Sequence, residues 1–174
     1  MNASQQSIHN TFLAFADTII PRTPELAEEY GRIQLYGAVD LYIDEYLIMS
    51  LNSTEVPLTE PIVETLDIAA VQLGGSSFAS LSYNDRLRAL NLLTQSDIDP
   101  ALLPAPFTGN LGYEQYTIGY LIRLVFLGYY SEWSGYGSTR LAPPEQRTLE
   151  YFPVSWQQIG YPGPSLGYRV QLEA

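Results

Sequence analysis

The sequence predicts a mainly α-helical protein, folded as a single domain that is an irregular bundle of about five helices. Its 174 residues suffice for one domain of ordinary size. Hydrophobic residues make up 46% of the chain and charged residues only 16%, a balance typical of a folded protein rather than a disordered one. Apolar side chains also recur at helical spacing in several long segments, and this pattern favours helices over strands.

The first part of the chain supplies three helical segments. A helix is expected over 7–20, where an apolar stripe precedes Pro21, which stops it. A short helical piece is expected over 24–30, and a long helix over 33–51. For the long helix, we expect an inward face of Leu35, Tyr36, Val39, Tyr42, Ile43, Tyr46 and Leu47, and an outward face of Asp40, Asp44 and Glu45.

Two further helices have clear start signals. One begins at Thr59, read as the N-cap with Pro61 in the first turn, and ends at the pair Gly74-Gly75. The other opens with a capping box that runs from Ser82 to Asp85, and it continues to about Thr94.

The last predicted helix covers about 113–130 and is apolar on nearly every side. A helix of this kind is typical of the centre of a bundle, so we expect it to be buried. Its only interior charge, Arg123, is then expected to pair with a carboxylate or several carbonyls, because an unpaired buried charge is costly. After Gly128 the helical period ends, and the remaining residues predict an irregular C-terminal cap rich in Gly, Pro and aromatic side chains.

The charges and the aromatic side chains lie in different parts of the chain. Residues 1–99 form an acidic helical part with a net charge of −10, whereas residues 100–174 have a net charge of −1. The second part holds nine of the 14 Tyr residues and both Trp residues. Tyr, Trp and Arg are enriched in protein interfaces, so this part favours a surface for contact with another protein. The alternative is that these rings fill the core of the C-terminal part.

Composition excludes several classes of function. The 19 acidic residues, eight Arg and no Lys give a net charge of −11, which argues against binding to nucleic acid or to an anionic membrane. Without Cys there is no disulfide, Cys zinc site or iron–sulfur cluster, and His9 is the only imidazole. We therefore expect no metal site, no cofactor bound by this chain and no direct membrane insertion. The first residues do not predict a secretory signal.

Few residues are candidates for catalysis. Asp40 and Asp44 are one helical turn apart, a spacing that a glycosidase or a hard metal ion can use. Other acidic residues lie nearby, however, and this favours a solvated helix face. His9 is interpreted as a polar surface residue, since no motif for a Ser or Cys nucleophile accompanies it. We accordingly assign no catalytic residue and expect the chain not to be an enzyme on its own.

Three segments resemble the gluconate 2-dehydrogenase subunit 3 family. They are Phe15-Ala-Asp-Thr-Ile-Ile-Pro21, then Gly37-Ala-Val-Asp-Leu-Tyr-Ile-Asp-Glu-Tyr-Leu47, and finally Gly128-Tyr-Tyr-Ser131 followed by Ser155-Trp-Gln-Gln-Ile-Gly-Tyr-Pro-Gly-Pro164. The resemblance implies a small accessory subunit without a cofactor of its own. Its expected partner is a large subunit that holds FAD and oxidises a sugar or polyol, in some cases together with a cytochrome subunit. The small subunit helps the large one to mature and to be exported.

The loop before the last motif departs from the family, because Trp133 and Tyr136-Gly-Ser138 replace its Pro and Gly-Gly-Asn. Members usually carry a twin-arginine leader, which this sequence lacks. A cytoplasmic location and an extracytoplasmic one after removal of a leader are therefore both open.

The C-terminal motif supplies the expected contact residues for the large subunit. Two prolines fix φ and Gly163 allows a bend, so 160–164 is predicted to be a rigid turn that loses little entropy on binding. The predicted partner-binding residues are Trp133, Tyr136, Trp156, Tyr161, Pro162, Gly163 and Pro164. Two alternatives are a stand-alone sugar-binding module that stacks Tyr and Trp rings on its ligand, and a hydrolase that uses Asp40 and Asp44.

Overall fold

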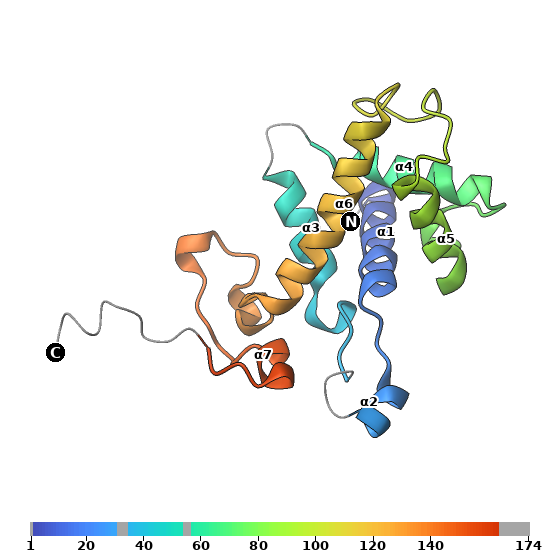
Figure 1. Cartoon of the computed structure of the whole chain (residues 1–174). Coiled ribbons are helices and arrows are strands. Elements are labelled where there is room, and N and C mark those ends of the chain that lie inside the picture. The colour runs from blue at the N-terminus through green and yellow to red at the C-terminus, as the bar shows by residue number, and fades with distance from the viewer. Residues whose placement is uncertain (1, 31–34, 54–56, 164–174) are drawn as a thin grey trace.

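The computed structural model describes residues 2–30, 35–53 and 57–163, and within these ranges the protein is a helical bundle without β-strands (Figure 1). The longer helices are α1 (Ala3–Ile19), α3 (Ile43–Asn52), α4 (Thr59–Gln72), α5 (Tyr83–Thr94) and α6 (Leu111–Tyr130). The shorter ones are α2 (Pro24–Tyr30), η2 (Val39–Leu41), η3 (Phe78–Ser80), η4 (Trp133–Gly135), η5 (Gly137–Thr139), η6 (Pro144–Gln146) and α7 (Val154–Ile159). The predicted fold class is confirmed.

Helix α1 lies at the centre of the bundle and packs against α3, α4, α5 and α6. It begins earlier than predicted, because Asn2 and Gln5 form a capping box. The Gln5 N–H donates to Asn2 Oδ1 over 2.8 Å, and the Asn2 N–H donates to Gln5 Oε1 over 3.0 Å. The apolar stripe predicted from the sequence is confirmed: Phe12, Phe15 and Ala16 are fully buried.

The long helix predicted over 33–51 is wrong in its first part. The backbone from 35 to 38 is an irregular turn that leads into η2, and α3 begins only at Ile43. Tyr42 has a φ of 57°, a left-handed conformation that a continuous helix cannot contain. The turn is held by a tertiary hydrogen bond in which the Ala38 N–H donates to the Ile20 carbonyl over 2.8 Å.

This break changes which side chains face the core. Tyr36, Val39 and Tyr42 were expected inside but are exposed, whereas Asp44 was expected outside but is buried. Ile43 and Leu47 are fully buried, so the inward face predicted for them is confirmed, and the helical wheel of one continuous helix fails for the residues before α3 and for Asp44. Residues 33 and 34, the start of that predicted helix, lie outside the described residues.

Helices α4 and α5 lie close to where the sequence places them. Thr59 is the first residue of α4 rather than its N-cap, which is Leu58. Ser82 is the N-cap of α5, as predicted, and its side chain accepts a hydrogen bond from the Asp85 N–H over 3.2 Å.

The prediction that α6 is buried on all sides is wrong. One face packs into the core through Ile118, Leu121, Val125 and Tyr129. Figure 1 shows α6 in front of α1 and α3, with no other element covering its near side. The structure therefore gives the central position to α1, and one face of α6 remains exposed.

The C-terminal cap is irregular, as predicted, but contains η4, η5, η6 and α7. It is attached to the α3 region by polar contacts as well as by packing. Arg140 Nε lies 2.9 Å from Glu45 Oε2, and Trp133 Nε1 donates to the Tyr42 carbonyl over 2.9 Å. Throughout the described ranges, every helix is too short or too polar to cross a membrane.

Candidate functional site

The exposed side of α6 carries large apolar side chains along most of its length. We call this side the α6 face, and it comprises Tyr116, Tyr120, Arg123, Phe126, Leu127 and Tyr130. Most of these residues follow the spacing i, i+4, i+7, i+11 and i+14, which puts them on one side of a helix about 21 Å long. Tyr116 is 64% exposed and Leu127 is 58% exposed, although both are of types that a bundle usually buries.

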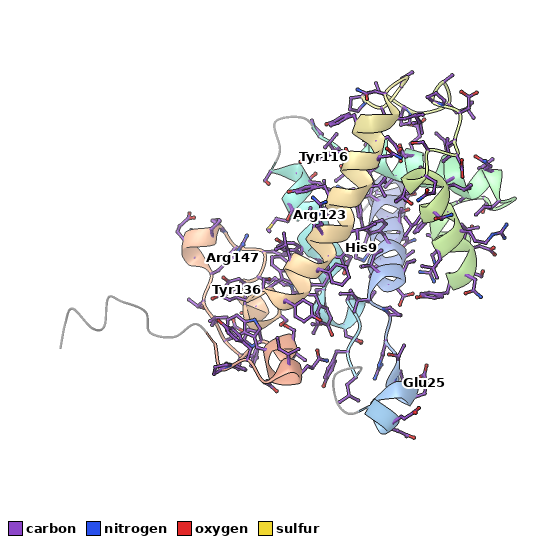
Figure 2. The ribbon with its side chains drawn as sticks, viewed as in Figure 1. His9, Glu25, Tyr116, Arg123, Tyr136 and Arg147 are labelled. Atoms are coloured by element: carbon purple, nitrogen blue, oxygen red, sulfur yellow. The ribbon has the colours of Figure 1, made fainter. Side chains whose placement is uncertain are left out.

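Arg123 lies in the middle of the α6 face and is exposed, so the predicted pairing of a buried Arg123 with a carboxylate is wrong. It has no hydrogen bond or ion pair with any described residue. The other arginines in the described ranges all have partners: Arg22, Arg86, Arg88, Arg140 and Arg147. Figure 2 shows Arg123 on α6, well separated from Arg147 of the C-terminal cap. Its guanidinium group is available to a carboxylate of another molecule.

An aromatic cluster of Phe152, Trp156 and Tyr161 lies beside the C-terminal end of the α6 face. Trp156 Nε1 donates to the Tyr130 carbonyl over 2.8 Å. The Trp156 ring makes edge contacts with the rings of Phe152 and Tyr161, at centroid distances of 5.6 and 5.0 Å. Phe152 and Tyr161 are partly exposed, so the aromatic cluster extends the α6 face onto the C-terminal cap.

The structure divides the predicted partner-binding residues into two groups. Trp133 and Trp156 are only 1% and 7% exposed, and both indole N–H groups donate to backbone carbonyls, so these rings hold the cap in place. Tyr136 is half-buried, and its hydroxyl donates to Glu132 over 2.8 Å.

Tyr161 and Pro162 are exposed and belong to the surface. Gly163 has a φ of 92°, a conformation that glycine adopts without strain, and it lies near the Trp156 ring. Pro164 lies outside the described residues. Tyr161 and Pro162 are therefore accessible, and their role in binding stays a prediction. The sequence did not indicate the α6 face, because Tyr and Leu at helical spacing were assigned to the core.

The carboxylates proposed for a hydrolase do not act as a pair. Asp40 Oδ2 accepts from the Gly37 N–H over 2.9 Å, whereas Asp44 Oδ2 lies 3.2 Å from His9 Nδ1. Burial raises the pKa of Asp44, and the neighbouring His9 partly opposes that effect. The contact between His9 and Asp44 links α1 to α3. It was not predictable, because the sequence pattern placed Asp44 on the outward side.

Glu114 is a buried carboxylic acid at the N-terminal end of α6. It is 1% exposed, and its Oε1 atom has no hydrogen-bond partner. Burial raises the pKa of Glu114 to about 7. Because burial disfavours the charged form of this carboxyl group, its ionisation is expected to lower the stability of the fold. Among the residues that the structure describes, no three His, Cys, Asp or Glu residues are grouped so as to hold a metal ion.

The three motifs that carry the family resemblance meet in space. A Cβ atom added to Gly37 would lie 2.6 Å from the backbone nitrogen of Arg22, directly after the first motif. Similarly, a Cβ atom added to Gly128 would lie 2.6 Å from the ring of Tyr46 in the second motif. The Tyr129 hydroxyl donates to the Tyr36 carbonyl over 2.7 Å. The motifs therefore form one packed junction and have a structural role.

Comparison of the whole chain with models of protein families gives no match. Comparison with curated proteins and with solved structures also gives no match.

Proposed function

We propose that this chain is a non-catalytic small subunit that binds a larger, FAD-dependent sugar or polyol dehydrogenase and assists its assembly. This is the role implied by the motifs that resemble the gluconate 2-dehydrogenase subunit 3 family. In some complexes of this kind a cytochrome subunit is the third component. FAD would be held by the large subunit and not by this chain.

The α6 face is the observation that supports this proposal most strongly. It carries exposed aromatic and aliphatic side chains together with Arg123, which has no ion pair among the described residues, and the aromatic cluster adjoins its end at Tyr130. Large exposed apolar surfaces are uncommon on monomeric proteins and are typical of interfaces. Tyr and Arg are also the residue types that most often supply binding energy at an interface. We assign this surface to the large subunit.

A second supporting feature is the way the motifs pack. Segments that are far apart in the sequence, from Phe15 to Trp156, meet at the ends of α1 and α6 and at the start of α3. This is expected when the motifs maintain one particular fold. It is also expected of an accessory subunit, which provides a binding surface rather than catalytic residues.

The proposal is tested by purifying the tagged chain from its native host. We expect a flavoprotein to copurify that contains bound FAD and oxidises a sugar or polyol with an artificial electron acceptor. The double substitution Tyr120→Ser and Leu127→Ser should weaken the complex by at least about tenfold, because both side chains are exposed on the α6 face.

Leu87→Ser serves as the control, since Leu87 is also an exposed leucine but belongs to α5 and not to the α6 face. Undiminished binding by the double variant would contradict the assignment of the surface. Failure of any flavoprotein to copurify would contradict the proposed function itself. Turnover of a sugar by the isolated chain would also overturn it.

The alternative function, a stand-alone sugar-binding module, predicts that the purified chain binds sugars. Calorimetric titration of the chain with sugars measures this binding. Quenching of Trp fluorescence is not suitable, because Trp133 and Trp156 are buried. Binding that disappears in the double variant would favour this alternative.

A further inference from the structure

A groove follows α4 where this helix meets the N-terminal end of α1, away from the α6 face. Its volume is about 1080 Å³. Helix α4 lines it at positions i, i+3, i+4, i+7, i+8, i+11 and i+12, from Glu60 to Gln72, so the groove extends over about 18 Å. The lining residues are Ser4, Ser7, Ile8, Glu60, Val63, Glu64, Asp67, Ile68, Val71, Gln72, Asp99 and Leu102.

Part of the groove is apolar. Ile8, Val63 and Ile68 supply aliphatic surface along its walls. Val71 and Leu102 are 62% and 61% exposed and stand at the groove without a covering element. A bound molecule with an apolar side would remove these side chains from water, which is favourable.

The charged residues of the groove are all acidic. Glu60, Glu64 and Asp67 follow one another at i, i+4 and i+7 along α4, and Asp99 lies on the adjoining segment. No arginine lines the groove, and none of these carboxylates has an ion pair with a described residue.

Like charges one turn apart on a helix repel each other, so the column on α4 lowers the stability of the free protein. The Asp67 side chain is half-buried, and its Oδ1 accepts a hydrogen bond from the Phe78 N–H over 2.7 Å. Burial raises the pKa of Asp67. A cationic molecule in the groove would relieve this repulsion.

We infer that this groove binds a basic amphipathic helix of another protein, with Lys or Arg residues facing the α4 carboxylates and apolar residues covering Val71 and Leu102. A helix laid along α4 places side chains at the same i, i+4 and i+7 spacing as Glu60, Glu64 and Asp67. A basic amphipathic helix therefore complements both the carboxylates of the groove and its apolar walls.

The composition of this chain argues that the ligand comes from elsewhere. The chain has eight Arg and no Lys, and none of the helices from α1 to α7 carries a row of basic residues. A second copy therefore does not supply the required charge. This inference does not depend on the proposed flavoprotein partner, because the groove shares no residue with the α6 face.

The test uses the purified full chain and a fluorescein-labelled synthetic peptide of about 14 Leu and Lys residues, arranged as an amphipathic helix. Fluorescence anisotropy should give saturable binding that weakens as sodium chloride is added, because salt screens charges at the surface. A peptide of the same composition in scrambled order, without an amphipathic face, should bind at least about tenfold more weakly.

Two substitutions test the site itself. Glu60→Gln combined with Glu64→Gln should weaken binding about fivefold, since two exposed pairings are lost. The control is Glu28→Gln combined with Glu29→Gln, which makes the same change in net charge on exposed residues of α2, at the opposite end of the molecule (Figure 1). Val71→Ser should weaken binding at both low and high salt, with Leu87→Ser as its control. Circular dichroism checks that each variant is folded.

Equal affinity for the ordered and scrambled peptides would overturn the inference. An equal loss of peptide affinity in the Glu60/Glu64 variant and in the Glu28/Glu29 control would also overturn it. Complete displacement of the peptide by spermine at the same concentration of charge, with equal ease for the parent chain and for Val71→Ser, would show a site for polycations only and would also overturn it. If Val71→Ser leaves the affinity for the peptide unchanged, the apolar walls do not contribute to binding, and this result counts against the inference.

Discussion

The carboxyl group of Glu114 gives the protein a stability that depends on pH. Burial raises its pKa from the ordinary value of 4.5 to about 7. Below pH 4.5 the folded and unfolded chains both hold the proton, and the burial of a neutral acid costs least. Between about pH 4.5 and 7 the unfolded chain releases the proton while the folded chain keeps it, so stability falls as the pH rises. Above pH 7 the loss is complete.

Glu114→Gln replaces this acid by a neutral side chain of the same shape. We expect the variant to be more stable than the parent at pH 8, by up to about 3 kcal/mol, because a shift of one pKa unit corresponds to about 1.4 kcal/mol. The difference should disappear towards pH 4.5. Urea unfolding at a series of pH values measures it, with the exposed Glu145→Gln as control. A difference that is constant with pH would contradict the assigned pKa.

The pair of His9 and Asp44 shows what side-chain identity alone leaves undetermined. The sequence pattern predicts a surface position for His9 and an outward acidic face for Asp44, with nothing that relates the two residues. The break at Tyr42 rotates Asp44 into the core, where its carboxylate lies 3.2 Å from the imidazole. Because Asp44 is buried, we interpret the pair as a polar contact that holds α1 against α3.

Two glycines of α6 differ in what surrounds them. Gly119 is in the exposed half of the helix, and a Cβ atom added there would meet nothing within 4 Å. By contrast, Gly128 is buried against the ring of Tyr46, which itself contacts the Trp133 ring edge-on at a centroid distance of 5.2 Å. The Tyr46 ring therefore has little room to move.

Gly119→Ala should stabilise the protein by about 0.5–1 kcal/mol, since alanine restricts the unfolded chain and favours the helix. Gly128→Ala in the same helix should destabilise it by about 1–3 kcal/mol, because the added methyl group overpacks the contact with Tyr46. Thermal unfolding of the two variants side by side measures both effects. Equal shifts in Tm would show that the Tyr46 ring adjusts freely and that the junction is not tightly packed.

Most helices were predictable because their start signals and apolar stripes are local. The N-cap Ser82 and the buried stripe of α1 are of this kind. The capping box of Asn2 and Gln5 is also local, and it would have placed the start of α1 correctly. In contrast, the break before α3 depends on the Ala38–Ile20 hydrogen bond and on the close approach of Gly37 to the backbone near Pro21. Contacts between distant segments leave no periodic signal in the sequence.

The candidate surface was predictable only in part for a related reason. A row of Tyr and Leu residues at helical spacing predicts an apolar face, but it does not distinguish a face that meets the core from one that meets a partner. In α6 both faces are apolar, so the sequence favoured complete burial. The position of α1 at the centre of the bundle decides which side of α6 is covered.

Over the whole molecule, the acidic charge lies mainly in residues 1–99, which carry a net charge of −10. A few ion pairs connect distant parts of the fold, among them Arg86 with Asp17 at 3.1 Å and Arg140 with Glu45 at 2.9 Å. In both pairs the arginine side chain is largely buried, so salt screens them less than it screens the exposed acidic residues. Repulsion between exposed carboxylates is therefore the larger salt-dependent effect.

Added sodium chloride should consequently stabilise this protein. At pH 7 we expect Tm to rise by about 2–4 °C between low salt and about 0.5 M, which corresponds to about 1 kcal/mol for a domain of this size. The variant with Glu28→Gln and Glu29→Gln should have a higher Tm at low salt and a smaller rise with salt, because two exposed negative charges are absent. A Tm that falls as salt is added would mean that the ion pairs of Arg86 and Arg140 outweigh the repulsion, and that the acidic surface is not a source of instability in the free chain.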